Sequence, residues 1–162
     1  MNDPRPLWAP WRIDFIRGEK EKRCFLCDKK DNFNTPDEDM MIHRGEHTFV
    51  ILNRFPYNSG HLMVSPYHHI GDIAELTPEE QSELMQLTIR AKETLRRLMQ
   101  PQGFNIGFNL GQAAGAGVAD HIHLHIVPRW NGDTNFMPVI GDTRVVPEAL
   151  AQTVRIIRDA WE

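Results

Sequence analysis

His121-Ile122-His123-Leu124-His125-Ile126-Val127 alternates histidine with aliphatic residues. Side chains alternate between the two faces of an extended strand, so the three imidazoles are expected on one face and the aliphatic side chains on the other. The aliphatic face can be covered by a core. Each imidazole needs a hydrogen-bond partner or a metal, because an unsatisfied polar group in an apolar environment is costly. The stretch therefore predicts a strand that carries either metal ligands or a nucleophilic imidazole for phosphate chemistry.

Four further segments have the composition of strands, bounded by residues that favour turns. They cover residues 40–42, 48–53, 61–65 and 104–109. Arg44-Gly45-Glu46 is expected to form the turn between the first two, and Pro66 is expected to stop the third. With the histidine-rich strand, these segments predict a sheet of about five strands.

A long helix is predicted after Thr77, because Thr77, Pro78 and Glu80 form a capping box with proline at the first helical position. Its apolar face recurs every three or four residues and consists of Leu84, Leu87, Ala91, Leu95 and Leu98. Pro101 and Gly103 should end it. A C-terminal helix is predicted to open at Pro147, with an apolar face of Leu150, Val154, Ile157 and Trp161.

These elements predict an α+β fold, an antiparallel sheet with one long helix and a C-terminal helix on one side. The sequence has no internal repeat, low-complexity segment or domain boundary, so residues 1–162 are expected to form one domain. Residues 1–20 are rich in proline and tryptophan and lack a clear period. We expect them to form a non-regular arm that packs on the body or on a second subunit, or that borders the cleft of the functional site.

Composition excludes several classes of function. Hydrophobic residues make up 41% and charged residues 25%, which is ordinary for a soluble globular protein. The formal net charge of −4 argues against a general nucleic-acid binder. No apolar run is long enough to span a bilayer, and the first residues lack a basic-then-apolar signal pattern, so a cytoplasmic protein without a membrane partner is expected.

Two smaller features also suggest chemistry. Cys24 and Cys27 are spaced CxxC, which in a reducing compartment indicates half of a metal site or a redox pair. Zinc would need two more ligands, and a thioredoxin-like helix is disfavoured by the polar, loop-like segment 28–39. The glycine-rich segment 111–117 directly precedes the histidines. Its backbone N–H groups could reach a phosphate, or it could be only a tight turn between strands.

The alternating histidines resemble the signature of the histidine triad (HIT) superfamily of nucleotide hydrolases and transferases. The run from Pro128 to Met137 and the segment Leu7-Trp8-Ala9-Pro10-Trp11-Arg12 are similar to a bacterial branch that includes diadenosine tetraphosphate phosphorylases. The resemblance covers nearly the whole chain. It implies a HIT-like fold, usually assembled as a homodimer, and a purine nucleotide as substrate.

The resemblance also implies roles for individual residues. His123, the middle histidine, would be the nucleophile that forms a covalent nucleotidyl-histidine. His125 would orient His123 or contact the phosphate, and His61 matches a Gly-His position near the triad. Asn53 matches a position that contacts the ribose hydroxyls.

The leaving-group contacts are less defined by the resemblance. Asn109 and Gln112 are candidates. Many family members carry a Gln-Ser or Gln-Thr pair shortly before the first histidine, whereas this chain has Gly115-Ala116-Gly117-Val118-Ala119-Asp120. That departure suggests that backbone N–H groups, such as the one at Gly117, contact the phosphate.

A zinc site is implied by related proteins that bind zinc through CxxC, a histidine after the third strand and the first triad histidine. The corresponding residues here are Cys24, Cys27, His69 and His121, with His68 as the alternative to His69. Four such ligands would make a closed, structural tetrahedron. Otherwise the cysteines are simply buried or free and His121 is hydrogen-bonded. The related galactose-1-phosphate uridylyltransferases are disfavoured, because they carry His-Pro-His and this chain has His121-Ile122-His123.

Several functions remain open at this point. The favoured hypothesis is cleavage of diadenosine polyphosphates through an AMP–histidine, with inorganic phosphate as acceptor to give ADP. The alternatives are water as acceptor, hydrolysis of adenosine 5′-phosphoramidates, and a non-catalytic zinc module that binds nucleotides. Mg²⁺ accompanying the nucleotide is left open. A catalytic metal held by all three histidines is disfavoured, because alternate strand positions lie about 6.6 Å apart.

Overall fold

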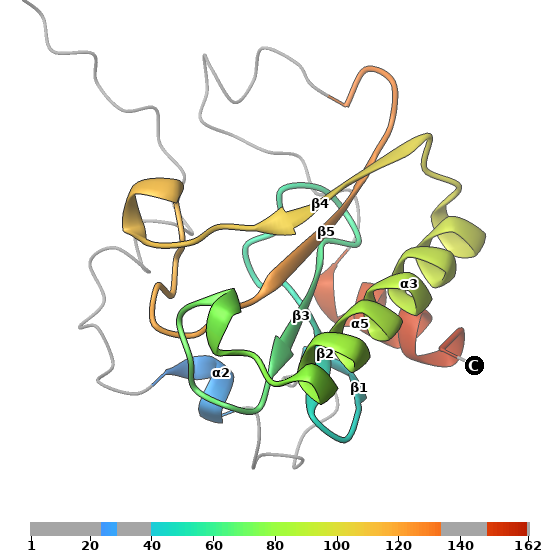
Figure 1. Ribbon diagram of the computed structural model, residues 1–162. Helices are drawn as coiled ribbons and strands as arrows, with labels where there is room; N and C mark the ends of the chain where they lie inside the picture. The colour runs from blue at the N-terminus through green and yellow to red at the C-terminus, as the bar shows by residue number, and fades with distance from the viewer. Residues whose placement is uncertain (1–23, 29–39, 134–148, 162) are drawn as a thin grey trace, which may run out of the picture.

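The computed structural model describes residues 24–28, 40–133 and 149–161 (Figure 1). Its centre is a five-stranded antiparallel sheet in the order β1-β2-β3-β5-β4. The strands are β1 (Met41–Arg44), β2 (Thr48–Leu52), β3 (Leu62–Pro66), β4 (Gly103–Phe108) and β5 (Leu124–Arg129). Strand β5 therefore inserts between β3 and β4. The predicted antiparallel sheet of about five strands is confirmed.

The long helix α3 (Pro78–Met99) begins with the predicted capping box. The Thr77 side chain accepts a hydrogen bond from the Glu80 amide, and the Glu80 carboxylate accepts one from the Thr77 amide. The helix ends at Gln100, whose φ of 48° is left-handed, just before Pro101. The other helical elements within the described residues are α2 (Phe25–Asp28), α5 (Leu150–Asp159), η1 (Ile73–Glu75) and η2 (Gln112–Ala114).

Apolar side chains cover both faces of the sheet. α3 contacts β2, β3 and β5, while α5 contacts β1 and α3, so both helices lie over one face (Figure 1). The core on this face includes Val50, Leu52, Val64, Leu95, Ile126 and Ile157. A smaller cluster on the other face consists of Leu26, Met41, Phe49, Ile51 and Met63. Leu26 belongs to α2, so the second cluster places the CxxC segment against the sheet.

The first part of the histidine-rich segment is not strand, which corrects the sequence-based prediction. β5 begins at Leu124, and His121 and His123 precede it. Ile122 instead donates its amide to the carbonyl of Ile70, 2.6 Å away, in the loop after β3. The chain is therefore pinned to a loop before it enters the sheet. Ile122, Leu124 and Ile126 nevertheless all reach the main core, so the expected alternation holds.

Other boundaries differ by one or two residues. β1 runs to Arg44 and contains an irregularity between Met41 and His43, so the turn is shorter than predicted. β3 includes Pro66, which pairs with Thr48 on β2. On its other side, β3 pairs with β5 only through residues 62–64. Pro66 lacks an N–H, but because it lies beyond this pairing, no hydrogen bond between β3 and β5 is lost.

The predicted N-terminal arm (residues 1–20), the segment 29–39 and Pro147 lie outside the described residues. The described C-terminal helix begins at Leu150, and its Val154 and Ile157 are buried, as is Trp161 beyond its end. Among the helices that the structure describes, none is both long enough and apolar enough to cross a bilayer.

Glu83 on α3 fastens the β1–β2 turn. Its carboxylate accepts hydrogen bonds from the amides of Glu46, His47 and Thr48 and from the Thr48 hydroxyl, at 2.6–2.9 Å. Burial alone would raise the pKa of Glu83, but these hydrogen bonds outweigh it and lower the pKa. A Cβ on Gly45 would come within 2.6 Å of a Glu83 oxygen, so any larger residue there would displace the carboxylate from these hydrogen bonds.

Candidate active site and metal centre

His123 is held with one ring nitrogen engaged and the other available. Its Nδ1 lies 2.9 Å from the carbonyl oxygen of His121. A carbonyl can only accept, so Nδ1 carries the proton and Nε2 keeps its lone pair. Burial lowers the pKa of His123, and the bond to the His121 carbonyl opposes that shift without cancelling it. A neutral imidazole with a free Nε2 is the form that a nucleophile at phosphorus requires.

His61 and His125 form a chain of hydrogen bonds with a defined direction. The backbone N–H of Tyr57 donates to Nδ1 of His61 at 3.1 Å, so the proton of His61 sits on Nε2. That Nε2 lies 2.9 Å from Nδ1 of His125, which must therefore accept. The proton of His125 is left on its Nε2. The chain thus turns His125 into a donor at the edge of the triad.

Burial lowers the pKa of His125 to about 4, with a smaller contribution from His123. Its ring meets that of His123 edge-on, with centroids 4.8 Å apart. His125 is therefore neutral near pH 7 and donates through Nε2–H rather than as a cation. A neutral donor beside a neutral nucleophile fits a site where negative charge develops on phosphate oxygens.

Three further side chains surround this pair. The Asn53 amide nitrogen lies 3.4 Å from Nδ1 of His61, which can accept from it. The Asn109 amide nitrogen lies 3.4 Å from Nε2 of His125, but both atoms are donors in this tautomer, so Asn109 bonds to that ring only with its amide turned to present the oxygen. The Tyr57 ring lies over His61 and His125, with centroids 4.8 and 6.0 Å away, and its side chain is exposed. The structure thus brings together His61, Asn53, Asn109, His123 and His125.

The glycine-rich segment is less closely tied to the triad. Gln112 opens η2 on an exposed loop, and Gly117 is also exposed. The amides of Ala114, Gly115 and Ala116 bond within the loop. In the part of the chain that the structure describes, no hydrogen bond joins Gln112 or Gly117 to the triad. The loop is open to solvent beside the site, and its role in binding phosphate remains a prediction.

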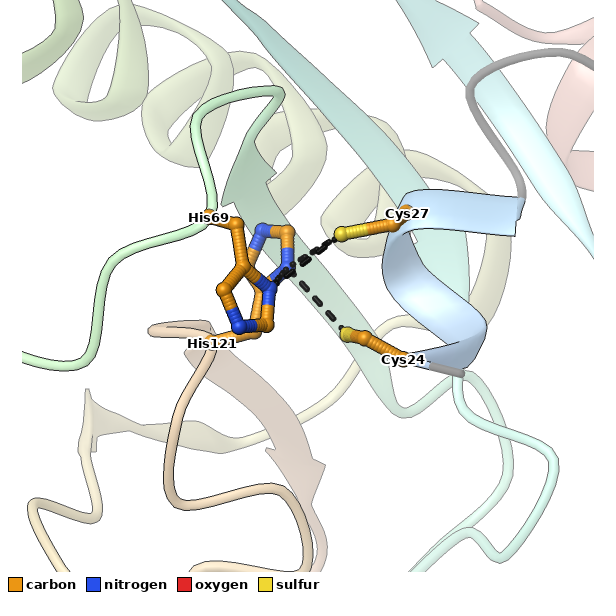
Figure 2. Close-up of side chains that lie close together, drawn as sticks. All are labelled: Cys24, Cys27, His69 and His121. Atoms are coloured by element: carbon orange, nitrogen blue, oxygen red, sulfur yellow. Dashed lines mark hydrogen bonds between the residues drawn. The ribbon is translucent and has the colours of Figure 1, made fainter. Parts of the chain in front are cut away.

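Cys24, Cys27, His69 and His121 converge on one point (Figure 2). Their ligand atoms all lie within 4.8 Å of one another. Nδ1 of His121 lies 3.3 Å from Sγ of Cys24, 3.4 Å from Sγ of Cys27 and 3.2 Å from Nδ1 of His69. A tetrahedron with Zn–S near 2.3 Å and Zn–N near 2.0 Å has edges of roughly 3.3–3.8 Å. The four residues fit such an ion.

The ring of His121 is also oriented as a ligand requires. Its Nε2 lies 2.9 Å from the carbonyl oxygen of Pro66, so Nε2–H donates there and Nδ1 turns its lone pair to the cysteines. His69, rather than His68, joins the cluster. His68 is exposed and its Nδ1 lies 3.7 Å from the Glu80 carboxylate. The geometry therefore identifies His69 as the candidate ligand, whereas the sequence left His68 and His69 as alternatives.

The sequence analysis assigned no role to Tyr57 and Asn58, which lie between the predicted strands 48–53 and 61–65. Tyr57 contributes both a backbone donor and a ring to the His61–His125 pair. The amide of His61 donates to the Asn58 carbonyl at 3.2 Å. A lone tyrosine four residues before His61 was the available signal for Tyr57. The backbone N–H of Tyr57 could not be predicted in this way, because every residue except proline carries one.

Comparisons with known proteins agree with this geometry. Residues 35–132 match the HIT domain. An AP-4-A phosphorylase of Mycobacterium tuberculosis is 37% identical over 162 residues, covering 96% of this chain and 83% of that protein. A zinc-bound histidine triad family protein from Mycobacterium smegmatis is 29% identical, with a TM-score of 0.68 over 85% of this chain and 92% of that one.

A HIT family protein from Bacillus anthracis is 26% identical, with a TM-score of 0.62, and the match covers 79% of this chain and 83% of that one. The match to the HIT domain covers more than half of the full chain of 162 residues. The fold neighbours share the same architecture at similar length. The chain belongs to the histidine triad family.

Proposed function

We propose that this protein cleaves diadenosine polyphosphates and transfers AMP through His123 to inorganic phosphate. The observation that carries the proposal is the bond from Nδ1–H of His123 to the His121 carbonyl, which leaves Nε2 free for attack. The similarity to the AP-4-A phosphorylase of Mycobacterium tuberculosis supports the choice of substrate.

The reaction proceeds in two displacements. Nε2 of His123 attacks the phosphorus next to one adenosine, an N–P bond forms, and the P–O bond to the remaining nucleotide breaks. With diadenosine tetraphosphate the leaving group is ATP. A phosphate oxygen then attacks the same phosphorus, the N–P bond breaks, and ADP leaves. His123 ends neutral, as it began.

The neighbouring residues would assist both displacements. Nε2–H of His125 would donate to a non-bridging oxygen of the reacting phosphate, while His61 holds His125 in that tautomer. Asn53 would bind the ribose hydroxyls and Asn109 the leaving phosphate. Backbone N–H groups near Gly117, with Gln112, would contact the polyphosphate. Mg²⁺ bound to the nucleotide would neutralise part of its charge.

Trapping the intermediate tests this function. Mixing with diadenosine tetraphosphate in the absence of phosphate, followed by rapid denaturation at alkaline pH and intact mass measurement, should reveal one AMP on the wild-type chain and none on His123→Ala. Gln86→Ala, on the exposed face of α3, is the matched control and should be adenylylated like the wild type. A phosphoramidase would instead be labelled preferentially by adenosine 5′-phosphoramidate, and a binding module by neither substrate.

We also propose that Cys24, Cys27, His69 and His121 bind a structural zinc ion. A closed set of two thiolates and two imidazoles supports this assignment, since such a set leaves no open position for substrate. Bound zinc would tie α2 to the loop after β3 and to the start of the triad segment. Elemental analysis of the purified protein should find about one zinc per chain, and Cys27→Ser should lower that ratio well below one half.

A homodimer is the third part of the proposal. β4 lies at the edge of the sheet, and Ile106 on it is 44% exposed. An exposed aliphatic side chain on an edge strand is a liability that a partner subunit removes. Light scattering should give twice the monomer mass, and Ile106→Asp should shift the protein towards monomer.

A further inference from the structure

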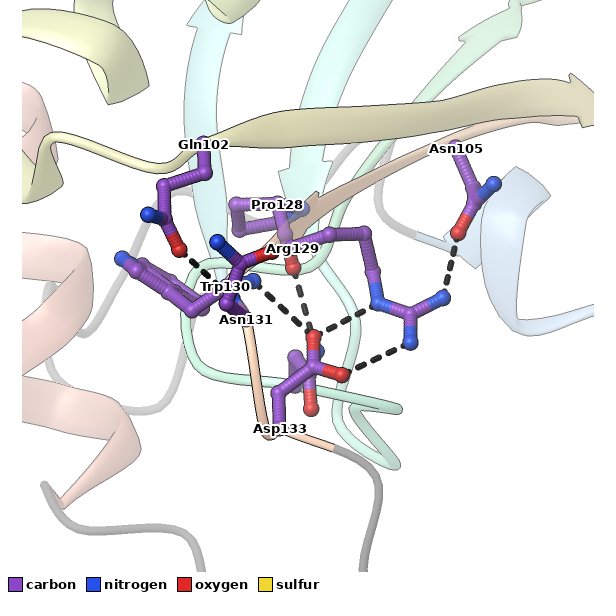
Figure 3. Close-up of polar contacts among 8 residues, drawn as sticks. Gln102, Asn105, Pro128, Arg129, Trp130, Asn131 and Asp133 are labelled. Carbon is purple, nitrogen blue, oxygen red and sulfur yellow. Dashed lines mark hydrogen bonds and ion pairs between the residues drawn. The ribbon is translucent and has the colours of Figure 1, made fainter.

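Asp133 joins the end of β5 to the loop between β2 and β3 (Figure 3). One carboxylate oxygen accepts from the Asn58 amide at 2.8 Å, from Nε of Arg129 at 2.6 Å and from the Trp130 amide at 3.1 Å. The other accepts from Nη2 of Arg129 at 2.7 Å. The Asp133 side chain is only 12% exposed, so water competes little for these bonds.

Asn58 is held by hydrogen bonds of both its side chain and its backbone. The two protons of its side-chain amide go to Asp133 and, at 3.1 Å, to the Pro128 carbonyl. Its backbone carbonyl accepts the amide of His61 at 3.2 Å. Its neighbour Tyr57 supplies the N–H that holds Nδ1 of His61. The position of Asn58 therefore decides where that N–H points.

We propose that Asn58 and Asp133 are positioning residues that fix the tautomers of His61 and His125. With the Tyr57 N–H in place, His61 donates to His125, and His125 turns its own donor towards the triad. If the loop moves away, Nδ1 of His61 loses the 3.1 Å bond from the Tyr57 N–H and keeps only the longer 3.4 Å contact with the Asn53 amide, so it can take the proton itself. The chain then reverses, and Nε2 of His125 becomes an acceptor.

The reversal matters for the function proposed above, on which the catalytic part of this inference rests. An acceptor on His125 would face the non-bridging phosphate oxygens with a lone pair instead of a proton. Transition-state stabilisation is lost, whereas ground-state binding through the ribose hydroxyls is kept. Disturbing Asn58 or Asp133 should therefore lower kcat with little change in KM.

The tautomers can be measured without substrate, by two-bond ¹⁵N–¹H correlation spectra of the histidine rings. In the wild type, His61 should carry its proton on Nε2 alone. Asn58→Asp places two carboxylates face to face, and Asp133→Asn puts an amide where the carboxylate was; each should give a mixture of His61 tautomers. The double variant, Asn58→Asp with Asp133→Asn, restores a donor–acceptor pair and should recover the wild-type pattern at least in part.

Asn105→Ala is the matched control. Asn105 accepts from Nη1 of Arg129 at the exposed end of the same network, and within the described residues no hydrogen bond joins its side chain to the loop between β2 and β3. The substitution Asn105→Ala should leave the His61 tautomer unchanged. The inference is overturned if both single variants keep the wild-type tautomer, if Asn105→Ala disturbs it equally, or if the double variant recovers nothing. Should Asn58→Asp fail to fold, Asp133→Asn and the double variant still decide.

Kinetics then test the catalytic part. In folded single variants kcat and kcat/KM should fall together by about tenfold, equivalent to about 1.4 kcal/mol, while KM stays within about twofold. Altered tautomers with an unchanged kcat would contradict the role in catalysis. A wild-type protein that does not turn over diadenosine polyphosphates would refute the proposed function and leave the tautomer measurement valid.

Discussion

Nδ1 of His123 lies 2.9 Å from the carbonyl oxygen of His121, the residue whose ring points to Cys24 and Cys27. His121 therefore uses its main chain for the triad and its side chain for the cysteine cluster. Because Nδ1–H of His123 is engaged, AMP should attach to Nε2. Proteolysis of the adenylylated protein at alkaline pH, followed by NMR of the labelled peptide, distinguishes the two isomers. Attachment at Nδ1 would mean that this bond breaks during the reaction.

Acid should destabilise the protein through His125. Its pKa is about 4 when folded, against 6.5 for an exposed histidine. Between these values the unfolded chain binds a proton that the folded chain excludes, so stability falls as pH drops from 6.5 to 4. The slope attributable to one group approaches about 1.4 kcal/mol per pH unit.

Urea unfolding at several pH values measures this slope. The free energy of unfolding of His125→Asn should depend less steeply on pH across that window than that of the wild type. The baseline stability of the variant does not matter, since only the slopes are compared. Equal slopes would contradict the lowered pKa, because they would show that His125 binds its proton equally well in the folded and unfolded states.

Glu83→Gln should destabilise the fold markedly. In the wild type, four donors bond to the two carboxylate oxygens of Glu83. Glutamine has the same shape, but one of these oxygens becomes an NH₂ group, which is itself a donor and cannot accept those bonds. Hydrogen bonds to a charged group contribute about 1.5–3 kcal/mol each at most, so a loss of about 2–3 kcal/mol in unfolding free energy is expected. Glu79→Gln, on the exposed face of the same helix, should cost a few tenths. Similar losses for both would contradict the assignment.

Metal removal should weaken the region around α2 first. Dialysis against a chelator at neutral pH should lower Tm, and added zinc should restore it. Cys24→Ser should have a low Tm that neither treatment changes. In hydrogen exchange, the amide of Cys27, which donates to the Cys24 carbonyl at 3.0 Å, should lose protection while the amides of α3 keep it. Unchanged Tm and exchange after complete zinc removal would refute a structural role.

The sequence predicted the elements with strong local signals. Thr77, Pro78 and Glu80 marked the start of α3 because a capping box depends only on near neighbours. The apolar alternation placed Ile122, Leu124 and Ile126 in the core. It overextended the strand, however, because pairing ends where Ile122 bonds to Ile70, a contact between distant segments.

For the candidate site, the sequence predicted most of the residues but not how they contact one another. The histidines and cysteines were visible as residue types, but the difference between His68 and His69 depended on the direction of the chain after β3. Asn58 and Asp133 lie 75 positions apart, and nothing local indicates that they meet. The direction of the His61–His125 chain comes from a backbone amide, which the sequence cannot reveal.

Product analysis with diadenosine tetraphosphate, with and without inorganic phosphate, tests the central proposal most directly. Transfer of AMP from His123 to phosphate predicts ADP and ATP in equal amounts, appearing over repeated turnovers only when phosphate is present. Without phosphate, ATP should appear in a single burst equal to the enzyme concentration. Steady formation of AMP and ATP regardless of phosphate would contradict the phosphorylase and identify water as the acceptor.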